Sequence, residues 1–235
     1  IRIERGIFME MQALKQVLQE NGIVGAGGAG FPTYAKLDER AEVILMNCAE
    51  CEPLLKLHRQ LLDQRAEEIL RTFDGIARTV GAQEAVIGIK REYKAAVKAI
   101  ETYIDAYPNM RIQLLDSVYP MGDEVVLIYE ATGRVIRPGG LPIEEGVAVF
   151  NVETVYNAYR ALERQTPVFD KLVSVVGEVE RPVTLRVPIG ASIGDTVAYA
   201  GGITAKEPAY LVGGPMMGNL ATDSDVVTKT TNAII

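Results

Sequence analysis

The densest cluster of residues that could do chemistry is the glycine run Gly25–Gly30, which Phe31 and Pro32 follow. Glycines let the backbone approach a ligand closely and expose several N–H groups to it. Such a set of N–H groups favours a phosphate, especially beside a helix N-terminus, although a tight glycine turn without a ligand explains the run equally well. The run follows a predicted helix and lacks a Gly-Lys-Ser/Thr ending, so it is neither a Rossmann turn nor a Walker A loop.

Polar side chains gather directly after the apolar run Val43–Met46, which predicts a buried strand. Asn47 offers a donor and an acceptor, and Glu50 and Glu52 offer acceptors. Because ligands of α/β sheets lie at the carboxyl ends of the strands, we interpret this segment as part of a binding site rather than as a polar loop. Lys36 could neutralise a phosphate or another anionic ligand, but an isolated lysine is more often simply solvated.

Two further segments place polar residues at the start of a helix. Gly122–Glu124 precedes the helix expected at Val125–Tyr129, and acidic side chains stabilise the first turn of a helix. Asn151 follows the strand predicted at Val147–Phe150 and opens a helix. Both helix capping and a ligand contact at a strand end fit this asparagine.

The cysteines Cys48 and Cys51 have the spacing of a redox dithiol or of half a metal site. A zinc or iron–sulfur site needs four ligands, and His58 is the only histidine that could join them. We therefore predict two ordinary thiols and no metal, and we expect His58 at the surface. With one histidine and no sign of an oxyanion hole, no catalytic residues of the protein itself are expected.

Short apolar strands that alternate with helices must position these side chains. The expected strands are 43–46, 85–89, 112–115 and 147–150, and the expected helices are 14–18, 61–80, 93–104, 125–129 and 153–162. This alternation predicts an α/β fold with a mainly parallel sheet covered on both faces, without revealing the strand order.

The pattern changes at Gln165–Pro167, where we place a domain boundary. The elements expected beyond it are a hairpin at 172–179 and 183–187, a helix at 192–200 and a strand at 209–212. Together they predict a small α+β unit. The expected domains are an α/β domain at 1–166, an α+β domain at 168–220, and a tail or truncated linker at 221–235.

The chain has 235 residues, of which 48% are hydrophobic, and a formal net charge of −7. This length and composition suit one large globular domain or two small ones. The negative charge argues against a nucleic-acid-binding protein, and no apolar run is long enough to span a membrane. Two cysteines and no export signal favour a cytoplasmic location.

Taken in order, these motifs resemble a known family of electron-transfer flavoproteins. The segments similar to the propanediol-utilisation cobalamin reductases, and to the C subunit of Rnf-type electron-transport complexes, are Gly22–Thr33, Ala49–Pro53 and Gly213–Gly218. The segments that resemble the flavin- and NADH-binding subunit of respiratory complex I are Gly25–Pro32, Lys36, Asn47–Pro53, Gly122–Glu124 and Asn151–Thr154.

The resemblance implies a Rossmann-like α/β domain that binds FMN, followed by a β-grasp domain of the soluble-ligand-binding type. The residues that it implies around FMN are Gly25, Gly27, Gly28, Gly30, Lys36, Asn47, Glu50, Gly122 and Asn151. It further implies that Phe31 stacks on the adenine of NADH and that Glu52 and Glu124 face the same nucleotide.

The function implied by the resemblance is NADH oxidation, with hydride transfer to FMN and onward delivery of electrons to an iron–sulfur or cobalamin acceptor. The expected enzyme is an NADH-dependent flavin oxidoreductase of the cobalamin-reductase type, with iron–sulfur clusters in a missing downstream segment. Its partners would be a nicotinamide nucleotide and a downstream electron-transfer subunit or cobalamin protein, and association with a membrane complex is compatible with this. The alternative is a non-catalytic ligand-binding or scaffold module of an electron-transfer complex.

Overall fold

The computed structural model describes residues 9–235, which form two compact units. The first unit comprises the residues up to Val24, Phe31–Cys51 and His58–Pro167. The second comprises Gly25–Gly30, Glu52–Leu57 and Val168–Ile235. The first eight residues of the domain expected at 1–166 lie outside the described part of the chain.

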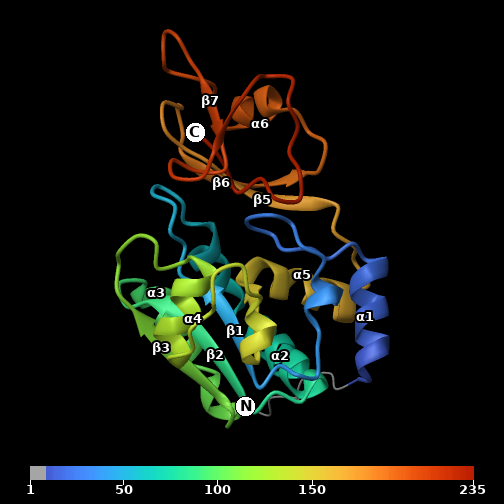
Figure 1. Cartoon of the computed structure of the whole chain (residues 1–235). Helices are drawn as coiled ribbons and strands as arrows, with labels where there is room; N and C mark the ends of the chain where they lie inside the picture. The colour runs from blue at the N-terminus through green and yellow to red at the C-terminus, as the bar shows by residue number, and fades with distance from the viewer. Residues whose placement is uncertain (1–8) are drawn as a thin grey trace. The chain divides into compact units, whose positions relative to one another are not determined.

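Helices and strands alternate along the first unit (Figure 1). Its elements are α1 (Met11–Glu20), the 3-10 helix η1 (Thr33–Lys36), β1 (Val43–Cys48), α2 (Leu57–Val80), β2 (Glu84–Lys90), α3 (Lys94–Glu101), η2 (Ile104–Ala106), β3 (Met110–Leu115), α4 (Glu124–Thr132), η3 (Pro142–Glu145), β4 (Val147–Asn151) and α5 (Val152–Arg164). The strands expected from the sequence are confirmed. No helix among residues 9–235 is long and apolar enough to cross a membrane.

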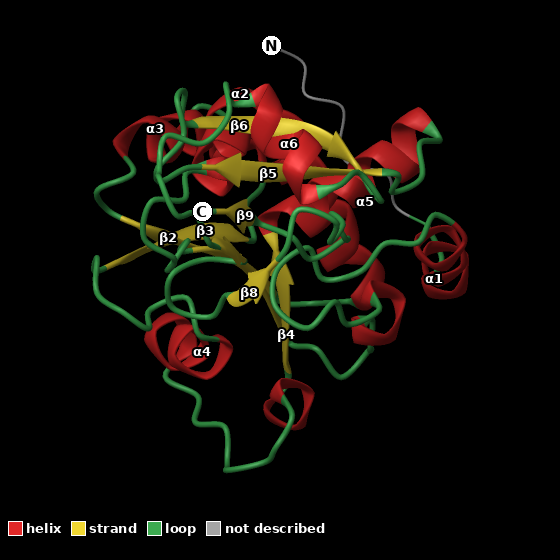
Figure 2. Ribbon diagram, turned by 90° about the horizontal axis from the view of Figure 1, so that it is seen from above, coloured by secondary structure: helices red, strands yellow, loops and turns green. Residues whose placement is uncertain are grey.

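The four strands of the first unit are all parallel, in the order β3-β2-β1-β4. Val43 and Leu45 of β1 point to one face, where they pack with Leu127 and Ile128 of α4. The other face carries α5, which contacts β1 and β4, with α2 beside it (Figure 2). The predicted parallel sheet with helices on both faces is therefore confirmed.

The second unit is a mixed sheet with one helix packed on it. Its elements are β5 (Asp170–Val175), β6 (Val183–Pro188), α6 (Ile193–Tyr199), β7 (Tyr210–Val212), β8 (Asn219–Ala221) and β9 (Ala233–Ile234). The strand order is β6-β5-β9-β7-β8, with β5 and β9 parallel and the other pairs antiparallel. This is the topology of a β-grasp fold. Ile193 and Val197 of α6 pack over Val173 and Val187, and Figure 2 shows α6 across β5 and β6.

The segment 221–235, expected as a tail or linker, instead completes this second sheet. Ala233 and Ile234 form β9, which pairs with β5 on one side and β7 on the other. Ala233 is buried and packs with Leu55 and Leu57. A two-residue strand in a polar segment has no hydrophobic period to detect, which is why the sequence did not reveal it.

Candidate functional site

The direction in which strands are added to the parallel sheet reverses between β1 and β4. From β1 the chain builds β2 and then β3 on one side, and it later adds β4 on the other side of β1. At such a switch point the loops after the two strands lead apart, and open α/β sheets bind their ligands there. Asn47 and Asn151 are register partners at this point. Two of the residues expected around a cofactor thus lie on neighbouring strands.

Lys36 brings a positive charge to β4, two residues before Asn151. It ends η1, and its Nζ donates to the carbonyl oxygen of Val149 in β4 at 2.9 Å. The ammonium also pairs with Glu124 Oε1 at 3.2 Å and lies 6.0 Å from the centre of the Phe31 ring. Lys36, which was expected at FMN, therefore lies close to Phe31 and Glu124, the two residues expected at NADH that belong to this unit.

Asn47 fixes the loop that leads into α4. Its Nδ2 donates to the Gly122 carbonyl at 2.8 Å, and its Oδ1 accepts from the Ala49 N–H at 3.1 Å. The Gly122 N–H donates to Cys51 Sγ at 2.6 Å, and a side chain at position 122 would collide with that sulfur. Asp123 then caps α4 by accepting two N–H groups of its first turn. The Cys51 sulfur thus leaves no room for a side chain at position 122. Asp123 has the helix-stabilising role that the sequence predicts.

Glu50 points inward and has an unfavourable backbone conformation. Its φ of 32° lies in the left-handed region, which costs a residue with a side chain about 1–2 kcal/mol. Two buried groups hold this conformation, because Lys90 Nζ and the Tyr93 hydroxyl both donate to the Glu50 carbonyl at 3.1 Å. Burial raises the pKa of Tyr93 to about 12, so the hydroxyl stays protonated at neutral pH. Neither Lys90 nor Tyr93 was singled out from the sequence.

His58, which we expected at the surface, is buried beside Glu50. Its Nδ1 lies 3.1 Å from Glu50 Oε2, and its Nε2 lies 3.9 Å from Glu153 Oε2. The side chains of all three are at most 5% exposed. At an effective dielectric constant of ~20, opposite charges about 4 Å apart attract by ~4 kcal/mol, against about 1 kcal/mol for a neutral hydrogen bond. The charge of this ring therefore decides how strongly it ties the two segments together.

A longer helix explains why His58 points inward. α2 begins at Leu57, about one turn earlier than the sequence pattern suggested. Position 58 then lies four residues before Leu62, on the face that α2 buries ahead of a kink at Arg65, whose φ of −136° is not helical. This helical spacing was the signal that could have identified His58. Glu153 was overlooked because α5 buries its first turn, which usually faces solvent.

The glycine run groups with the second unit rather than with the first. Gly28 and Gly30 have positive φ angles of 73° and 67°, which glycine adopts readily and other residues do not. A Cβ at Gly28 would meet no atom within 4 Å, whereas one at Gly30 would approach Thr230 Cγ2 to 3.0 Å. The backbone angle, and not crowding, is what requires glycine at position 28.

Glu52, expected at the nicotinamide nucleotide, is bonded within the second unit. Its two carboxylate oxygens accept from the N–H groups of Met216 and Met217 at 2.8 and 2.9 Å. Gly214, in the same loop, has a φ of 144°, and a side chain there would collide with the Glu52 carboxylate. The loop Gly213–Gly218 is therefore shaped around this carboxylate, and it leaves Met217 75% exposed.

The two cysteines are free thiols in different surroundings. Cys48 is buried in β1, and burial, with a smaller contribution from Glu50, raises the pKa of its thiol far above the ordinary range. Cys51 is only partly buried. Within the described residues, no three or more His, Cys, Asp or Glu side chains are arranged to hold a metal ion.

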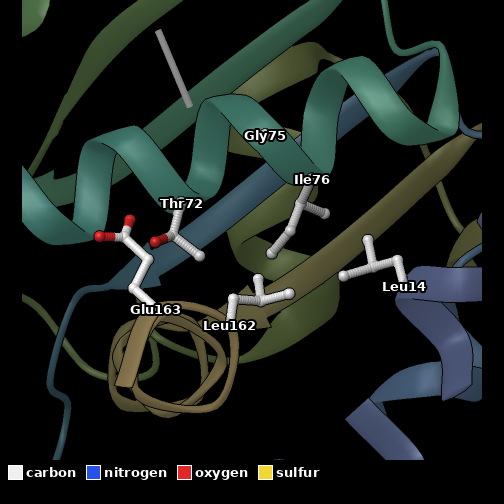
Figure 3. Close-up of a pocket in the computed structure, with 6 residues that line it drawn as sticks. All are labelled: Leu14, Thr72, Gly75, Ile76, Leu162 and Glu163. Carbon is white, nitrogen blue, oxygen red and sulfur yellow. The ribbon is translucent and has the colours of Figure 1, made fainter. Parts of the chain in front are cut away.

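A small pocket lies where α1, α2 and α5 meet, and none of the residues expected at FMN or NADH lines it. The side chains that line it (Figure 3) are Leu14, Thr72, Gly75, Ile76, Leu162 and Glu163. Its volume is about 10 Å³, which is roughly the room of a single water molecule. A cofactor therefore does not bind there.

The fold and the edge site define a class of protein, an α/β cofactor-binding domain joined to a β-grasp domain. A model of the family described as the Nuo51 FMN-binding domain matches residues 18–160, and a model of the SLBB domain matches residues 172–220. The chain belongs to the Nuo51 FMN-binding domain family. The matched range includes Gly25–Gly30 and Glu52–Leu57, which group with the second unit in the structure.

Individual relatives carry oxidoreductase names. The chain is 43% identical over 227 residues to the cobalamin reductase PduS of Citrobacter freundii, covering 96% of this chain and 50% of that protein. It is 30% identical over 233 residues to the C subunit of the Na⁺-translocating ferredoxin:NAD⁺ oxidoreductase complex of Acetobacterium woodii, covering 97% and 53%. An air-oxidized NAD⁺-reducing NiFe-hydrogenase superposes with a TM-score of 0.76 at 25% identity, covering 96% of this chain and 47% of that chain. The chain spans about half the length of the curated relatives it matches.

Proposed function

We propose that this chain binds FMN at the carboxyl edge of β1 and β4 and takes part in flavoprotein electron transfer. The observation that carries the proposal is the Lys36 ammonium, which lies between the Val149 carbonyl, two residues before the end of β4, and Glu124 at the start of α4. Its partner Glu124 is 43% exposed and Lys36 is 28% exposed, and pairs exposed to this degree contribute about 0–1 kcal/mol. Because the pair is weak, the ammonium can turn to a stronger anion at little cost. The donors at this edge therefore fit an anionic flavin.

The other side chains at the edge suit the same cofactor. Asn47 and Asn151 are held in place by bonds to the chain itself, so the surface that a ligand meets is formed in advance. When bound, FMN supplies a ring that takes up two electrons together and releases them singly. The protein binds and orients this ring, and Lys36 provides a positive charge where negative charge develops.

We further propose that NADH is the electron donor. The Phe31 ring is 51% exposed, which leaves its face open to stacking by a nucleotide base. The Glu124 carboxylate is partly exposed beside Lys36 and can accept from ribose hydroxyls. Glu52 gives this proposal no support, because both of its carboxylate oxygens accept from N–H groups of its own unit, those of Met216 and Met217. The name of the Acetobacterium woodii complex includes NAD⁺ as the electron acceptor, so it supports a nicotinamide nucleotide as a redox partner rather than the direction of transfer.

The electron acceptor is proposed to be an iron–sulfur centre or a cobalamin, on the remainder of a longer protein or on a partner subunit. The names of two relatives support this, since one is a cobalamin reductase and the other is a subunit of a ferredoxin-linked complex. A cytoplasmic location, with or without attachment to a membrane complex, is proposed because both cysteines are free thiols, as is usual in a reducing compartment.

A non-catalytic scaffold module is the second candidate function, and Glu52 is the observation that favours it. A carboxylate whose two oxygens both hold a loop of its own unit serves structure rather than substrate. This candidate predicts a protein that binds no flavin, or one whose bound flavin NADH does not reduce.

Anaerobic mixing of the FMN-loaded protein with NADH tests electron transfer and separates the two candidates. The flavin absorption band should bleach in the wild type. Glu124→Gln should keep FMN but slow bleaching by about tenfold, an effect on reduction rather than on binding. Glu130→Gln, at an exposed position of the same helix, is the matched control and should behave as the wild type. Bound FMN that NADH does not reduce would favour the scaffold.

A further inference from the structure

Three buried titratable side chains, Glu50, His58 and Glu153, form a connected cluster in the first unit. His58 Nδ1 lies 3.1 Å from Glu50 Oε2, which also accepts the His58 backbone N–H at 3.3 Å. On the opposite side of the ring, Nε2 lies 3.9 Å from Glu153 Oε2. The ring therefore joins the loop after β1 and the start of α2 to the start of α5.

Two carboxylates, those of Glu50 and Glu153, lie 3.1 and 3.9 Å from the two ring nitrogens. Titratable or charged groups in the same unit include Cys48, Arg59, Lys90, Tyr93 and Arg160. Lys90 and Tyr93 bond the backbone carbonyl of Glu50, not its carboxylate. Burial keeps the Cys48 thiol protonated by raising its pKa. Arg59 lies over the Tyr93 ring at 4.7 Å, and Arg160 is buried further along α5, on the same face as Glu153.

Asn151 faces the same ring nitrogen as Glu153 and defines two alternative charge states. Its Oδ1 accepts from the Glu153 N–H at 2.8 Å, which turns its Nδ2 towards His58 Nε2 at 3.5 Å. A neutral ring would accept from this amide, whereas an imidazolium would donate towards Glu153. The amide contact is at the distance limit of a hydrogen bond and is uncharged, while buried opposite charges attract more strongly. In either charge state Nδ1–H can donate to Glu50. The two states differ at Nε2, where the imidazolium gains the attraction of the Glu153 carboxylate at 3.9 Å and the neutral ring gains the Asn151 amide at 3.5 Å.

We propose that His58 is an imidazolium in the folded protein and bridges Glu50 to Glu153 as a positioning residue of the site. In this form it holds Glu50 in its left-handed conformation and fixes the first turn of α5, which Asn151 caps. The bridge itself depends on no cofactor. Its effect on FMN affinity rests on the proposed function.

The bridge has a defined dependence on pH. An unperturbed histidine loses its proton near pH ~6.5, and one whose charged form is stabilised by folding loses it at higher pH. The stabilisation is then fully present below about pH 6.5 and is lost as the pH rises through the folded-state titration of His58. Each unit by which folding raises this titration corresponds to a tenfold change in the folding equilibrium.

NMR of the imidazole tests the charge state directly, because the chain has a single histidine. Histidine is labelled with nitrogen-15 in flavin-free protein that carries no histidine tag, and both ring nitrogens are followed with pH. Both should carry a proton at neutral pH, with a titration midpoint above that of an unperturbed histidine. A neutral ring at neutral pH, with its lone pair on Nε2, would overturn the proposal.

A pair of substitutions on one helix tests the Glu153 half of the bridge. Glu153→Gln keeps the shape and removes the charge, and it should lower the His58 midpoint by about one unit, a tenfold change in proton affinity. Glu163→Gln, which interrupts the pair with Arg71 at the other end of α5, is the matched control and should leave the midpoint unchanged. An equal midpoint in both variants would remove Glu153 from the bridge and refute it.

FMN affinity as a function of pH tests the positioning role. Wild-type affinity should fall by about tenfold as the pH passes the His58 midpoint, and His58→Gln should bind weakly at every pH. The double variant His58→Gln/Glu153→Gln, which loses one charge of each sign, should recover part of the affinity. An FMN affinity that does not change as His58 titrates would refute the positioning role. Absence of FMN binding at any pH would refute the proposed function instead, and the flavin-free NMR result would still decide the bridge.

Discussion

Asn47 and Asn151 are register partners on β1 and β4, and each uses its side chain to hold the segment that follows. Asn47 donates to Gly122 and so fixes the loop before α4, while Asn151 accepts from Glu153 and so caps α5. The edge of the sheet is thus shaped by bonds within the chain. A ligand that binds there meets side chains whose rotamers are already set, which lowers the entropy lost on binding.

Lys36 should contribute to FMN affinity through its charge. Lys36→Met keeps much of the side-chain length, and loss of a charged hydrogen bond of about 1.5–3 kcal/mol should raise the Kd by roughly tenfold to a hundredfold. The reduced flavin should also form less readily, since no cation remains beside the ring. Flavin titration and anaerobic photoreduction measure the two effects. Lys94→Met, at an exposed position on α3, is the control. An equal loss of FMN affinity in both variants would show that Lys36 does not contribute to the site.

Gly28 tests the sequence-based prediction that the glycine run holds the FMN phosphate. A β-branched residue at its φ of 73° is strained by about 1–2 kcal/mol or more. Gly28→Val should therefore abolish FMN binding, because the loop could no longer keep the backbone conformation that holds the phosphate. Gly81→Val places the same side chain at a φ of 77°, also with no atom within 4 Å of the new Cβ. Circular dichroism should show both variants folded, and FMN affinity that is equal in the two would count against the glycine run.

Glu52 should hold the loop Gly213–Gly218 in place. Glu52→Gln replaces one of the two acceptors by a donor, and loss of a charged hydrogen bond worth about 1.5 kcal/mol should speed local opening by roughly tenfold. Amide hydrogen exchange at Met216 and Met217 measures this directly. Glu207→Gln, at an exposed position of the same unit, should leave both rates unchanged. Unaltered exchange in Glu52→Gln would show that the carboxylate does not hold the loop.

The two cysteines should differ in their reactivity towards an alkylating reagent. Cys48 is 1% exposed, and its thiol has a raised pKa because burial disfavours the thiolate. Native protein should be modified once, at Cys51, and a second time only after denaturation. Mass spectrometry of the alkylated peptides identifies the modified residue. Early modification of Cys48 would contradict the burial described for β1.

The helices and strands of the first unit follow from local patterns, but the order of its strands does not. Val43–Met46 and Val147–Phe150 are apolar runs whose side chains are buried on both faces, and such runs are recognisable in isolation. That β4 pairs with β1 rather than with β3 is a matter of long-range pairing. The switch point, and with it the neighbourhood of Asn47 and Asn151, therefore had to come from the structure.

The sequence predicts which residues belong to the candidate site, but it only partly predicts the contacts that each of them makes. Lys36 and Glu124 were both expected, yet their direct pairing depends on the placement of η1 against α4. Glu50 was expected to contact a ligand, but its left-handed backbone turns the carboxylate inward to His58. Such contacts join residues far apart in the sequence, and no local period or motif encodes them.

A flavin titration of the tag-free wild-type chain, with quenching of flavin fluorescence as the readout, decides whether this protein binds FMN. One FMN should bind per chain, saturably and with a Kd of about 10 µM or tighter. Riboflavin, which lacks the phosphate, should bind at least about tenfold more weakly, because a charged hydrogen bond is lost. Absence of saturable FMN binding, or equal affinity for riboflavin, would contradict the account.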